Sequence, residues 1–398
     1  MRLFLAIQVA LDAHPTILIS KERVFEIKYN ADEVWLDFLP FFGLETKHSH
    51  FENENLFDAG IRLRYPLFEG GRVYYGYQEQ IEKGHAANLE VRILEQDLIK
   101  NVKVAYINIL LYEWLLKAHQ TLKNQLSSLH ELTVNLIKNG LVSRPNLLRV
   151  KTQLLKAETS ITDYEKYVEI AKSVLLNLLN REQTQSIEVE NRLEHFISKD
   201  FSLAAVLDLA FEGRSEFDLY DRELAALDHA VDKANSVYWP RITADAIYGG
   251  ANYPMGYSGS GNRRMGNFEQ FWGVGLSIEL DFFSWAKAHK QSSQLESQKK
   301  QVELKEREFI NDLALEVKKS YLTWKAAQVN LKISKELSST AKQTYDEILA
   351  DYKTGKELSE AVLETLEAVI ESRKDYLKAF YDVYIAEAVL EREAGMIH

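Results

Sequence analysis

The sequence is dominated by long stretches that contain neither glycine nor proline and that meet at a short turn. No such residue occurs at positions 85–139 or at positions 146–212. Both residue types interrupt helix interiors, so their absence permits two very long helices. Between the stretches, Gly140 can end a helix, Ser143 can cap the next one, and Pro145 is compatible with a first helical turn. The pattern predicts a long helical hairpin.

The same pattern occurs twice. Gly355 ends a second stretch without glycine or proline, and it lies 215 positions after Gly140. The offset also relates pairs of identical residues, namely Phe68 and Phe283, Asp97 and Asp312, and Tyr106 and Tyr321. Nearer the N-terminus, Pro40 and Pro240 differ by 200 positions. A register maintained this far indicates a tandem duplication. We expect residues 1–181 to form a first repeat and residues 182–398 a second, interleaved in one elongated unit.

Residues 72–138 predict one helix about 100 Å long, because a helix rises about 1.5 Å per residue. Part of it has coiled-coil spacing, at Leu122, Leu126, Leu129, Thr133 and Leu136. The matching helix of the second repeat has the same spacing, at Ile310, Ala314, Val317, Tyr321, Trp324, Gln328 and Leu331. Such seams must pack on other helices, and residues 146–179 and 359–393 predict the partners. Shorter helices are expected at residues 3–13, 16–39, 201–210 and 218–237.

Four strands are expected ahead of the long helices, at residues 41–51, 59–68, 241–248 and 272–282. Two of them alternate apolar side chains with polar or small ones. Their apolar faces are Ala59, Ile61, Leu63, Tyr65 and Leu67, and Trp272, Val274, Leu276, Ile278, Leu280 and Phe282. Alternation with period two is typical of a strand with one apolar face. The fold class is therefore mainly α, with a small antiparallel β part.

Composition excludes several functions. The formal net charge of −11 argues against nucleic-acid binding, which needs a basic surface, and the absence of cysteine removes disulfides and thiolate sites. His48 and His50 could be metal ligands, but we interpret them as surface histidines. The glycine-rich residues 249–266 lack a phosphate-binding motif and predict a solvent-facing loop. We expect no catalytic residue, metal or cofactor.

The N-terminus has a weak signal-peptide pattern. Residues 1–11 are mostly apolar, but Gln8 interrupts them and no small-residue cleavage site follows. We expect a short amphipathic helix of the mature chain, so that no signal peptide is present in this sequence. No segment approaches the roughly 18 consecutive apolar residues of a membrane-spanning helix.

Three short motifs carry a family resemblance. They are PLFEGGR at residues 66–72, where a strand joins a long helix, NGLVS at residues 139–143, and YKTG at residues 352–355. With their order and the duplication, the chain resembles the TolC-like outer-membrane channels of efflux pumps and type I secretion. Four strands cannot close a channel by themselves, so several chains must share one barrel. The resemblance implies a homotrimer with a twelve-stranded β-barrel in the bacterial outer membrane and an α-helical tunnel in the periplasm.

The resemblance also implies sites. The chain would be a passive duct that opens when a periplasmic adaptor protein and an inner-membrane pump dock at its helical tips. The implied adaptor-binding residues are Gly140, Leu141, Val142, Ser143 and Gly355. The implied gate residues are Asn146, Tyr352, Glu357 and Glu364. Ala361 stands where the family has a second acidic residue, and Glu360 could replace it, although it would point differently.

The strand faces have an implied partner too. In the barrel, residues Ile61, Leu63, Tyr65, Trp272, Val274, Leu276 and Ile278 would face outer-membrane lipid. The competing hypothesis is a soluble coiled-coil structural or scaffold protein, which would explain the long helices. It would not explain an exposed apolar strand face, because such a face marks contact with a membrane or another protein.

Overall fold

The computed structural model describes residues 1–51, 54–139, 142–190, 202–252, 269–354, 356–357 and 359–397. These residues form eight α-helices and four β-strands, which confirms the mainly helical fold class. The chain divides into two compact units. The helical unit comprises Met1–Ser20, Val91–Ser215 and Phe309–His398, and the sheet unit comprises Lys21–Glu90 and Glu216–Glu308. Each unit combines segments from both halves of the sequence.

The sheet unit contains one antiparallel sheet with the strand order β1-β2-β3-β4. The strands are β1 (Phe41–Phe51), β2 (Glu54–Glu69), β3 (Arg241–Asn252) and β4 (Glu269–Glu279). Pairing of β2 with β3 joins the two halves of the chain edge to edge. Gly249 and Gly250, which the sequence placed in a loop, belong to β3. Ala251 and Asn252 also belong to β3, and the remaining residues of the predicted loop, 253–266, lie outside the described residues.

The end of β4 differs from the prediction for a physical reason. Asp281 accepts hydrogen bonds from the backbone amides of Phe283 (3.1 Å) and Ser284 (3.3 Å). These bonds turn the chain into the short 3₁₀ helix η2 (Phe282–Ser284), and α7 (Trp285–Lys353) follows. Leu280 and Phe282 therefore lie outside the strand.

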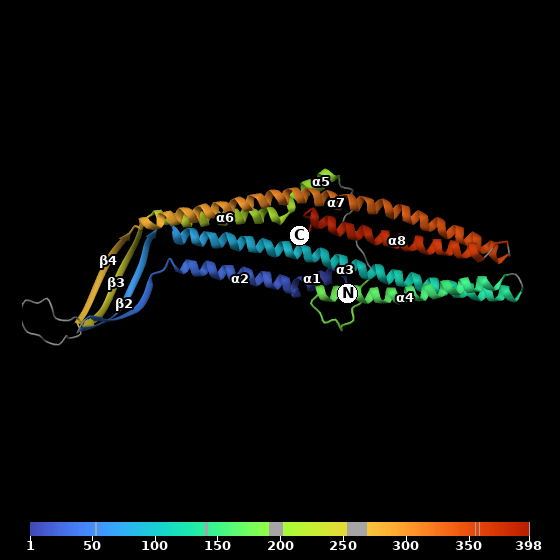
Figure 1. Ribbon diagram of the computed structural model, residues 1–398, viewed down its shortest axis with the longest axis horizontal. Coiled ribbons are helices and arrows are strands. Elements are labelled where there is room, and N and C mark those ends of the chain that lie inside the picture. Colours follow the sequence, from blue (N-terminus) through green and yellow to red (C-terminus); the bar gives the residue numbers. More distant parts are fainter. Residues whose placement is uncertain are drawn as a thin grey trace, which may run out of the picture. The chain divides into compact units, whose positions relative to one another are not determined.

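The helices of the sheet unit are parts of α2 (Pro15–Leu36), α3 (Arg72–Lys138) and α7, together with α6 (Ser215–Asn235) and the 3₁₀ helix η1 (Ser236–Tyr238) (Figure 1). The predicted bounds of α3 are confirmed. Gly70 and Gly71 join β2 to α3 with φ of 64° and 84°, a region that favours glycine. A Cβ atom on Gly70 would also collide with the carbonyl oxygen of Ser236, which explains the paired glycines.

The helical unit contains α1 (Leu3–Ala13), α4 (Arg144–Leu178), α5 (Leu203–Gly213) and α8 (Ser359–Glu393), with the remaining lengths of α3 and α7. Its predicted α3 seam is buried at Leu122, Leu126 and Leu129, which pack with Val150 and Leu366. Along the predicted seam of α7, residues 310–331, the buried residues are Leu313, Val317, Ser320, Trp324 and Ala327. The predicted seam was right at Val317 and Trp324. It was wrong by one position at Ala314, Tyr321 and Gln328, where the preceding residue is buried instead. The α-helix has 3.6 residues per turn, so a spacing of three and four residues can be continued from either of two adjacent positions.

Ion pairs fasten the C-terminal end of α8 within the helical unit. Lys103 Nζ lies 2.6 Å from Glu391 Oε2, and both side chains are only 9% exposed. Arg392 Nε lies 2.9 Å from Asp97 Oδ1. Buried charges are stable only when paired, so these contacts fix the end of α8 against α3.

The order of elements repeats along the chain. Helices α1 and α2, strands β1 and β2, and helices α3 and α4 are followed by α5, α6, β3, β4, α7 and α8 in the same order. Within the described ranges, no single helix is long and apolar enough to cross a membrane, although the bent pair α1 and α2 passes that test together by length and composition.

Candidate functional site

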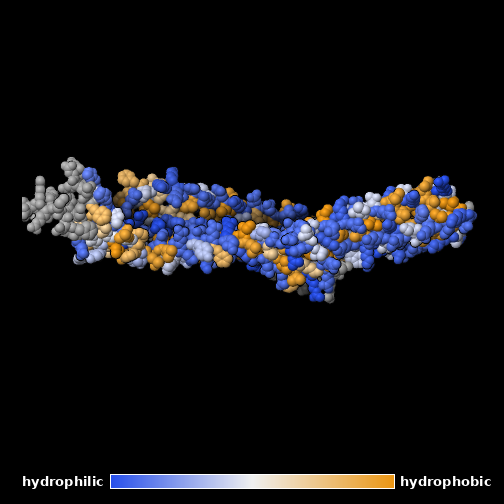
Figure 2. All heavy atoms as spheres, turned by 90° about the horizontal axis from the view of Figure 1, so that it is seen from below, coloured by the Kyte–Doolittle hydropathy of each residue, from blue (hydrophilic) through white to orange (hydrophobic). Residues whose placement is uncertain are grey.

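One face of the sheet is apolar across all four strands. The register places Phe42 opposite Leu63, Leu63 opposite Ala246, and Ala246 opposite Val274. This face includes every strand residue that the resemblance assigned to lipid, namely Ile61, Leu63, Tyr65, Trp272, Val274, Leu276 and Ile278. These side chains are 39% to 75% exposed, and hydrophobic residues gather on the surface near the sheet in Figure 2. The chain by itself leaves a broad apolar surface uncovered.

The opposite face of the sheet is charged. Arg62 pairs with Glu45 at 2.8 Å, Arg64 with Asp245 at 3.0 Å, and Arg241 reaches Glu279 at 3.7 Å. The pairs link β1 to β2, β2 to β3, and β3 to β4 in turn. The sheet therefore has one face suited to an apolar environment and one suited to water.

The described gate residues at the helical tips lie in different environments. Tyr352 is 2% exposed and packs among Leu126, Val362 and Leu366, and its hydroxyl has no hydrogen-bond partner among the described residues. Asn146 is half-buried, whereas Glu357, Glu360 and Glu364 are exposed. Glu360 Oε2 accepts from Arg149 Nη1 at 2.9 Å, an α4–α8 contact that the sequence did not suggest.

The adaptor-binding candidates are described only in part. Gly140, Leu141 and Gly355 lie outside the described residues. Ser143 is the N-cap residue of α4, as expected, but its side chain forms no capping hydrogen bond. Its carbonyl oxygen instead accepts from the Asn146 amide at 3.1 Å, and Pro145 lies in the first turn. Val142 is half-buried beside it.

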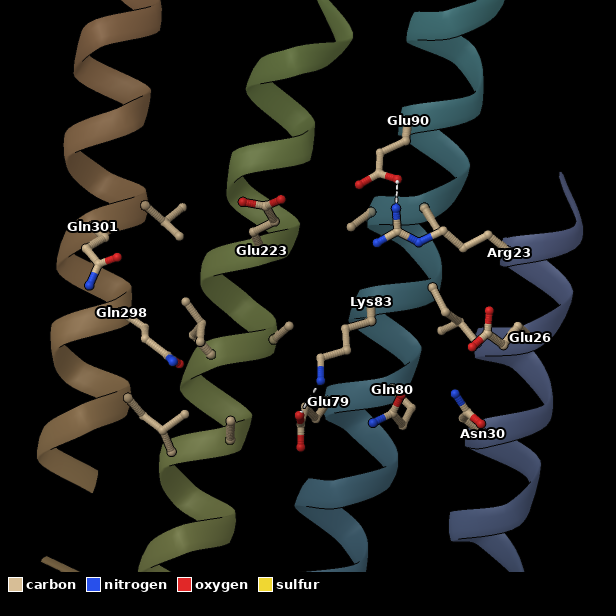
Figure 3. Close-up of a pocket in the computed structure, with 18 of the residues that line it drawn as sticks. Arg23, Glu26, Asn30, Glu79, Gln80, Lys83, Glu90, Glu223, Gln298 and Gln301 are labelled. Carbon is tan, nitrogen blue, oxygen red and sulfur yellow. Dashed lines mark hydrogen bonds and ion pairs between the residues drawn. The ribbon is translucent and has the colours of Figure 1, made fainter. Parts of the chain in front are cut away.

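The sheet unit also contains a cavity of about 750 Å³ between α2, α3, α6 and α7 (Figure 3). Its polar lining residues are Arg23, Glu26, Asn30, Glu79, Gln80, Lys83, Glu90, Glu223, Gln298, Gln301 and Lys305. Its apolar lining residues are Ile27, Ala86, Ala87, Ala226, Leu227, Ala230, Leu295 and Val302. On each helix they recur every three or four positions, so each helix turns one face toward the cavity.

The sequence analysis missed this cavity, although the duplication contains a signal for it. The offset of 200 relates Ile27 of α2 to Leu227 of α6. The offset of 215 relates Ala87 of α3 to Val302 of α7. These offsets account for most of the lining, so equivalent faces of both repeats meet at the cavity. Two equivalent pairs carry opposite charges, namely Arg23 with Glu223, and Glu90 with Lys305.

Most charges in the cavity are paired. Glu79 accepts from Lys83 at 2.5 Å and from Lys233 at 3.1 Å, and Arg23 lies 3.0 Å from Glu90. Burial raises the pKa of the Glu79 carboxyl, but the two lysines lower it by more, so the pKa lies below its ordinary value. Burial and the nearby Glu90 raise the pKa of Glu223, while Lys305 lowers it, and the net pKa is raised.

The described residues contain no group of three or more histidine, cysteine, aspartate or glutamate side chains placed to hold a metal ion. His48 and His50 lie on β1 and are both exposed. Their exposure agrees with the interpretation as surface histidines.

Comparison with solved structures shows the fold. The outer-membrane channel OprN is 16% identical, with a TM-score of 0.83 over 99% of this chain and 89% of that one. VceC from Vibrio cholerae is 14% identical, with a TM-score of 0.81 over 99% of this chain and 96% of that one. MtrE from Neisseria gonorrhoeae, solved in an open state, is 16% identical, with a TM-score of 0.81 over 99% of this chain and 89% of that one.

No curated protein matches the chain. A family model described as outer membrane efflux protein matches residues 6–181 and 209–396, and thus both repeats. The repeated strand-and-hairpin order, the apolar sheet face and this match agree, and the chain belongs to the outer membrane efflux protein family.

Proposed function

We propose that three copies of this chain form a channel through which the substrates of a tripartite efflux or type I secretion system leave passively. Membership of the family makes the protein an outer-membrane efflux channel and not an enzyme. The observation that supports an assembly of several copies is the open sheet: it exposes an apolar face, and β1 and β4 are its edges. Unpaired edges are unstable in lipid, so strands of several copies must close a barrel.

In that barrel, the apolar face from Ile61 to Ile278 would meet lipid, and the ion-paired face would line water. Twelve strands would come from three copies. The repeats 1–181 and 182–398 would alternate around the axis, which agrees with the repeated order of elements. The long helices would continue the barrel as a tunnel in the periplasm.

Light scattering in mild detergent, combined with negative-stain imaging, tests the assembly. We expect a mass near three times the 45.9 kDa chain and an elongated particle with a stain-filled tunnel. A monomer or dimer that stays soluble without detergent would contradict the channel and favour the coiled-coil scaffold.

The tips at residues 140–143 and 355 would bind a periplasmic adaptor that works with an inner-membrane pump. The gate would involve Asn146, Tyr352, Glu357, Glu360 and Glu364. Support for this role is the chemistry at the tip: exposed carboxylates, and a buried Tyr352 hydroxyl without a partner in the described part of one chain.

A double variant tests the gate. Tyr352→Phe with Glu357→Ala removes two polar groups from the closed tip, so we expect higher single-channel conductance in planar bilayers. Leu148→Ala, on the exposed surface of α4, provides the control and should leave conductance unchanged. Equal conductance of the double variant and the original chain would remove Tyr352 and Glu357 from the gate.

A further inference from the structure

The cavity of the sheet unit has the properties of a small-molecule site. Its volume of about 750 Å³ lies within the usual range for such sites, about 300–1,000 Å³. The deepest lining residues are small or aliphatic, because Ala86, Ala87, Ala226 and Ala230 are buried and leave the space open. Polar side chains surround this apolar floor (Figure 3). A ligand with a bulky apolar body would therefore fit.

The lining residues carry a small negative charge, because four carboxylates (Glu26, Glu79, Glu90 and Glu223) face three cations (Arg23, Lys83 and Lys305). Arg23 is paired with Glu90, and Glu79 is paired with Lys83 and with Lys233, which lies outside the lining. Glu223 and Glu26 have no ion pair within the described residues, and Lys305 is the one lining cation there without one. Glu223 is half-buried and close enough to Glu90 for repulsion. A bound cation would relieve this repulsion and stabilise the ionised carboxylate.

We propose that the cavity binds amphipathic organic cations, with the apolar body against the alanine floor and the positive charge beside Glu223. Glu26 adds a second carboxylate at the exposed rim, on the equivalent face of the other repeat. An anion of the same shape would meet Glu223, Glu26 and Glu90 and would bind more weakly. The ligand class therefore follows from the carboxylates and not from the volume.

The place of this cavity in the channel rests on the proposed function. Figures 1 and 3 show α7, α6, α3 and α2 side by side in the sheet unit. The four helices form one curved layer. Their side chains can converge on a single cavity only on the concave side of that layer. Equivalent faces of both repeats line it, so in a closed ring all copies of the cavity would face the same side. The concave side of a ring faces its axis, so the cavity would open toward the axis. A passing cation would then bind transiently to the tunnel wall.

Equilibrium dialysis tests the binding. The full chain in detergent micelles is dialysed against tetraphenylphosphonium, with protein-free micelles to subtract partitioning. Tetraphenylborate has nearly the same shape and the opposite charge, so it is the matched ligand control. We expect saturable binding of the phosphonium. We expect Glu223→Gln to weaken it about 5- to 10-fold, as removal of one partly buried charge should.

Two further variants test whether the effect is specific to the cavity and depends on the sign of the charge. Glu296→Gln removes a carboxylate from an exposed position of α7 outside the cavity, and it should leave the affinity unchanged. Lys305→Gln removes the competing cation and should tighten binding about 2- to 5-fold. Equal binding of the two ions overturns the proposal, as does an equal effect of Glu223→Gln and Glu296→Gln. If Glu223→Gln does not assemble, unchanged affinity of Lys305→Gln overturns it.

Planar-bilayer recording separates this site from the proposed function. We expect tetraphenylphosphonium to reduce the current through the original channel, and to do so less for Glu223→Gln. Conduction without any binding in dialysis would overturn the cation site and leave the channel intact. Binding by a protein that does not conduct would leave the site and overturn the proposed function.

Discussion

Glu79 is the most fully paired carboxylate of the cavity. Its side chain is 11% exposed and contacts lysines on both α3 and α6. Hydrogen bonds between charged groups stabilise the folded state more than neutral ones do. Glu79 therefore joins two helices that come from different repeats, while its charge is cancelled locally.

Glu79→Gln should lower the free energy of unfolding by about 1 to 2 kcal/mol at neutral pH, because both lysines stay partly exposed and the pair is partly screened. The folded-state pKa of Glu79 is lowered from 4.5, so its stabilisation is present above that value and is lost as the pH falls through the folded-state pKa. Thermal unfolding followed by circular dichroism from pH 7 to pH 3 checks this. Glu296→Gln is the control. If the difference in stability between the original chain and Glu79→Gln stays the same from pH 7 to pH 3, the role of Glu79 is contradicted.

Lys103 offers a second test at a buried ion pair. Lys103→Met leaves Glu391 buried without this partner and should destabilise the chain by about 3 to 5 kcal/mol. The double variant Lys103→Met with Glu391→Leu removes both charges and should recover most of the loss. Denaturant unfolding of the single and double variants measures this difference. A double variant as unstable as the single one would show that the pair itself, and not the stranded charge, stabilises α8.

At the scale of elements, the sheet is defined by its two unlike faces. Register alone brings apolar residues of four strands together on one side and the arginine–carboxylate pairs on the other. In β1, where alternation along the sequence is weak, Phe42 and Leu44 still share the apolar face through their partners in β2. The strand pairing, more than the composition of each strand, makes the surface continuous.

Val274→Lys places a charge on the apolar face. In lipid it should cost about 2 to 4 kcal/mol near the bilayer midplane and less toward the interfaces. Ser277→Lys, on the opposite face of the same strand, is the matched control and should be tolerated. The measurement is the fraction of protein that is inserted and trypsin-resistant in outer-membrane vesicles. Equal insertion of both variants would show that Val274 does not face lipid.

At the scale of the whole molecule, closure of the proposed barrel requires that β1 of one copy pairs with β4 of the next. The chain has no cysteine, so introduced cysteines react without background. Within one chain, β1 and β4 are separated by β2 and β3. Strands lie about 4.8 Å apart, so the two edges are roughly 14 Å apart, too far for a disulfide.

Leu44→Cys combined in turn with Trp272→Cys, Val274→Cys or Leu276→Cys should therefore give a crosslink between copies in at least one combination. Denaturing gel electrophoresis of oxidised membranes should show covalent species that end at the trimer. Species that continue to larger sizes would indicate an open assembly. No crosslink in any combination would contradict closure through these edges.

The sequence by itself determined the features that depend on neighbouring residues. The glycine and proline positions marked the C-terminal end of α3 and the start of α4, although Gly76 and Gly84 lie inside α3. Period-two alternation identified the apolar faces of β2 and β4, and the offset between repeats predicted the recurring order of elements. Steric limits and side-chain direction act within a few residues, so they can be read locally.

Only the tertiary structure decided contacts between distant segments. In α7 it buried Leu313 instead of Ala314, and it extended β3 through Gly249 by pairing with β2. It also joined Lys103 to Glu391 and brought Glu223 and Glu90 to one cavity. The physical reason is that burial and charge pairing act on whatever side chains packing brings together, and packing depends on the whole chain.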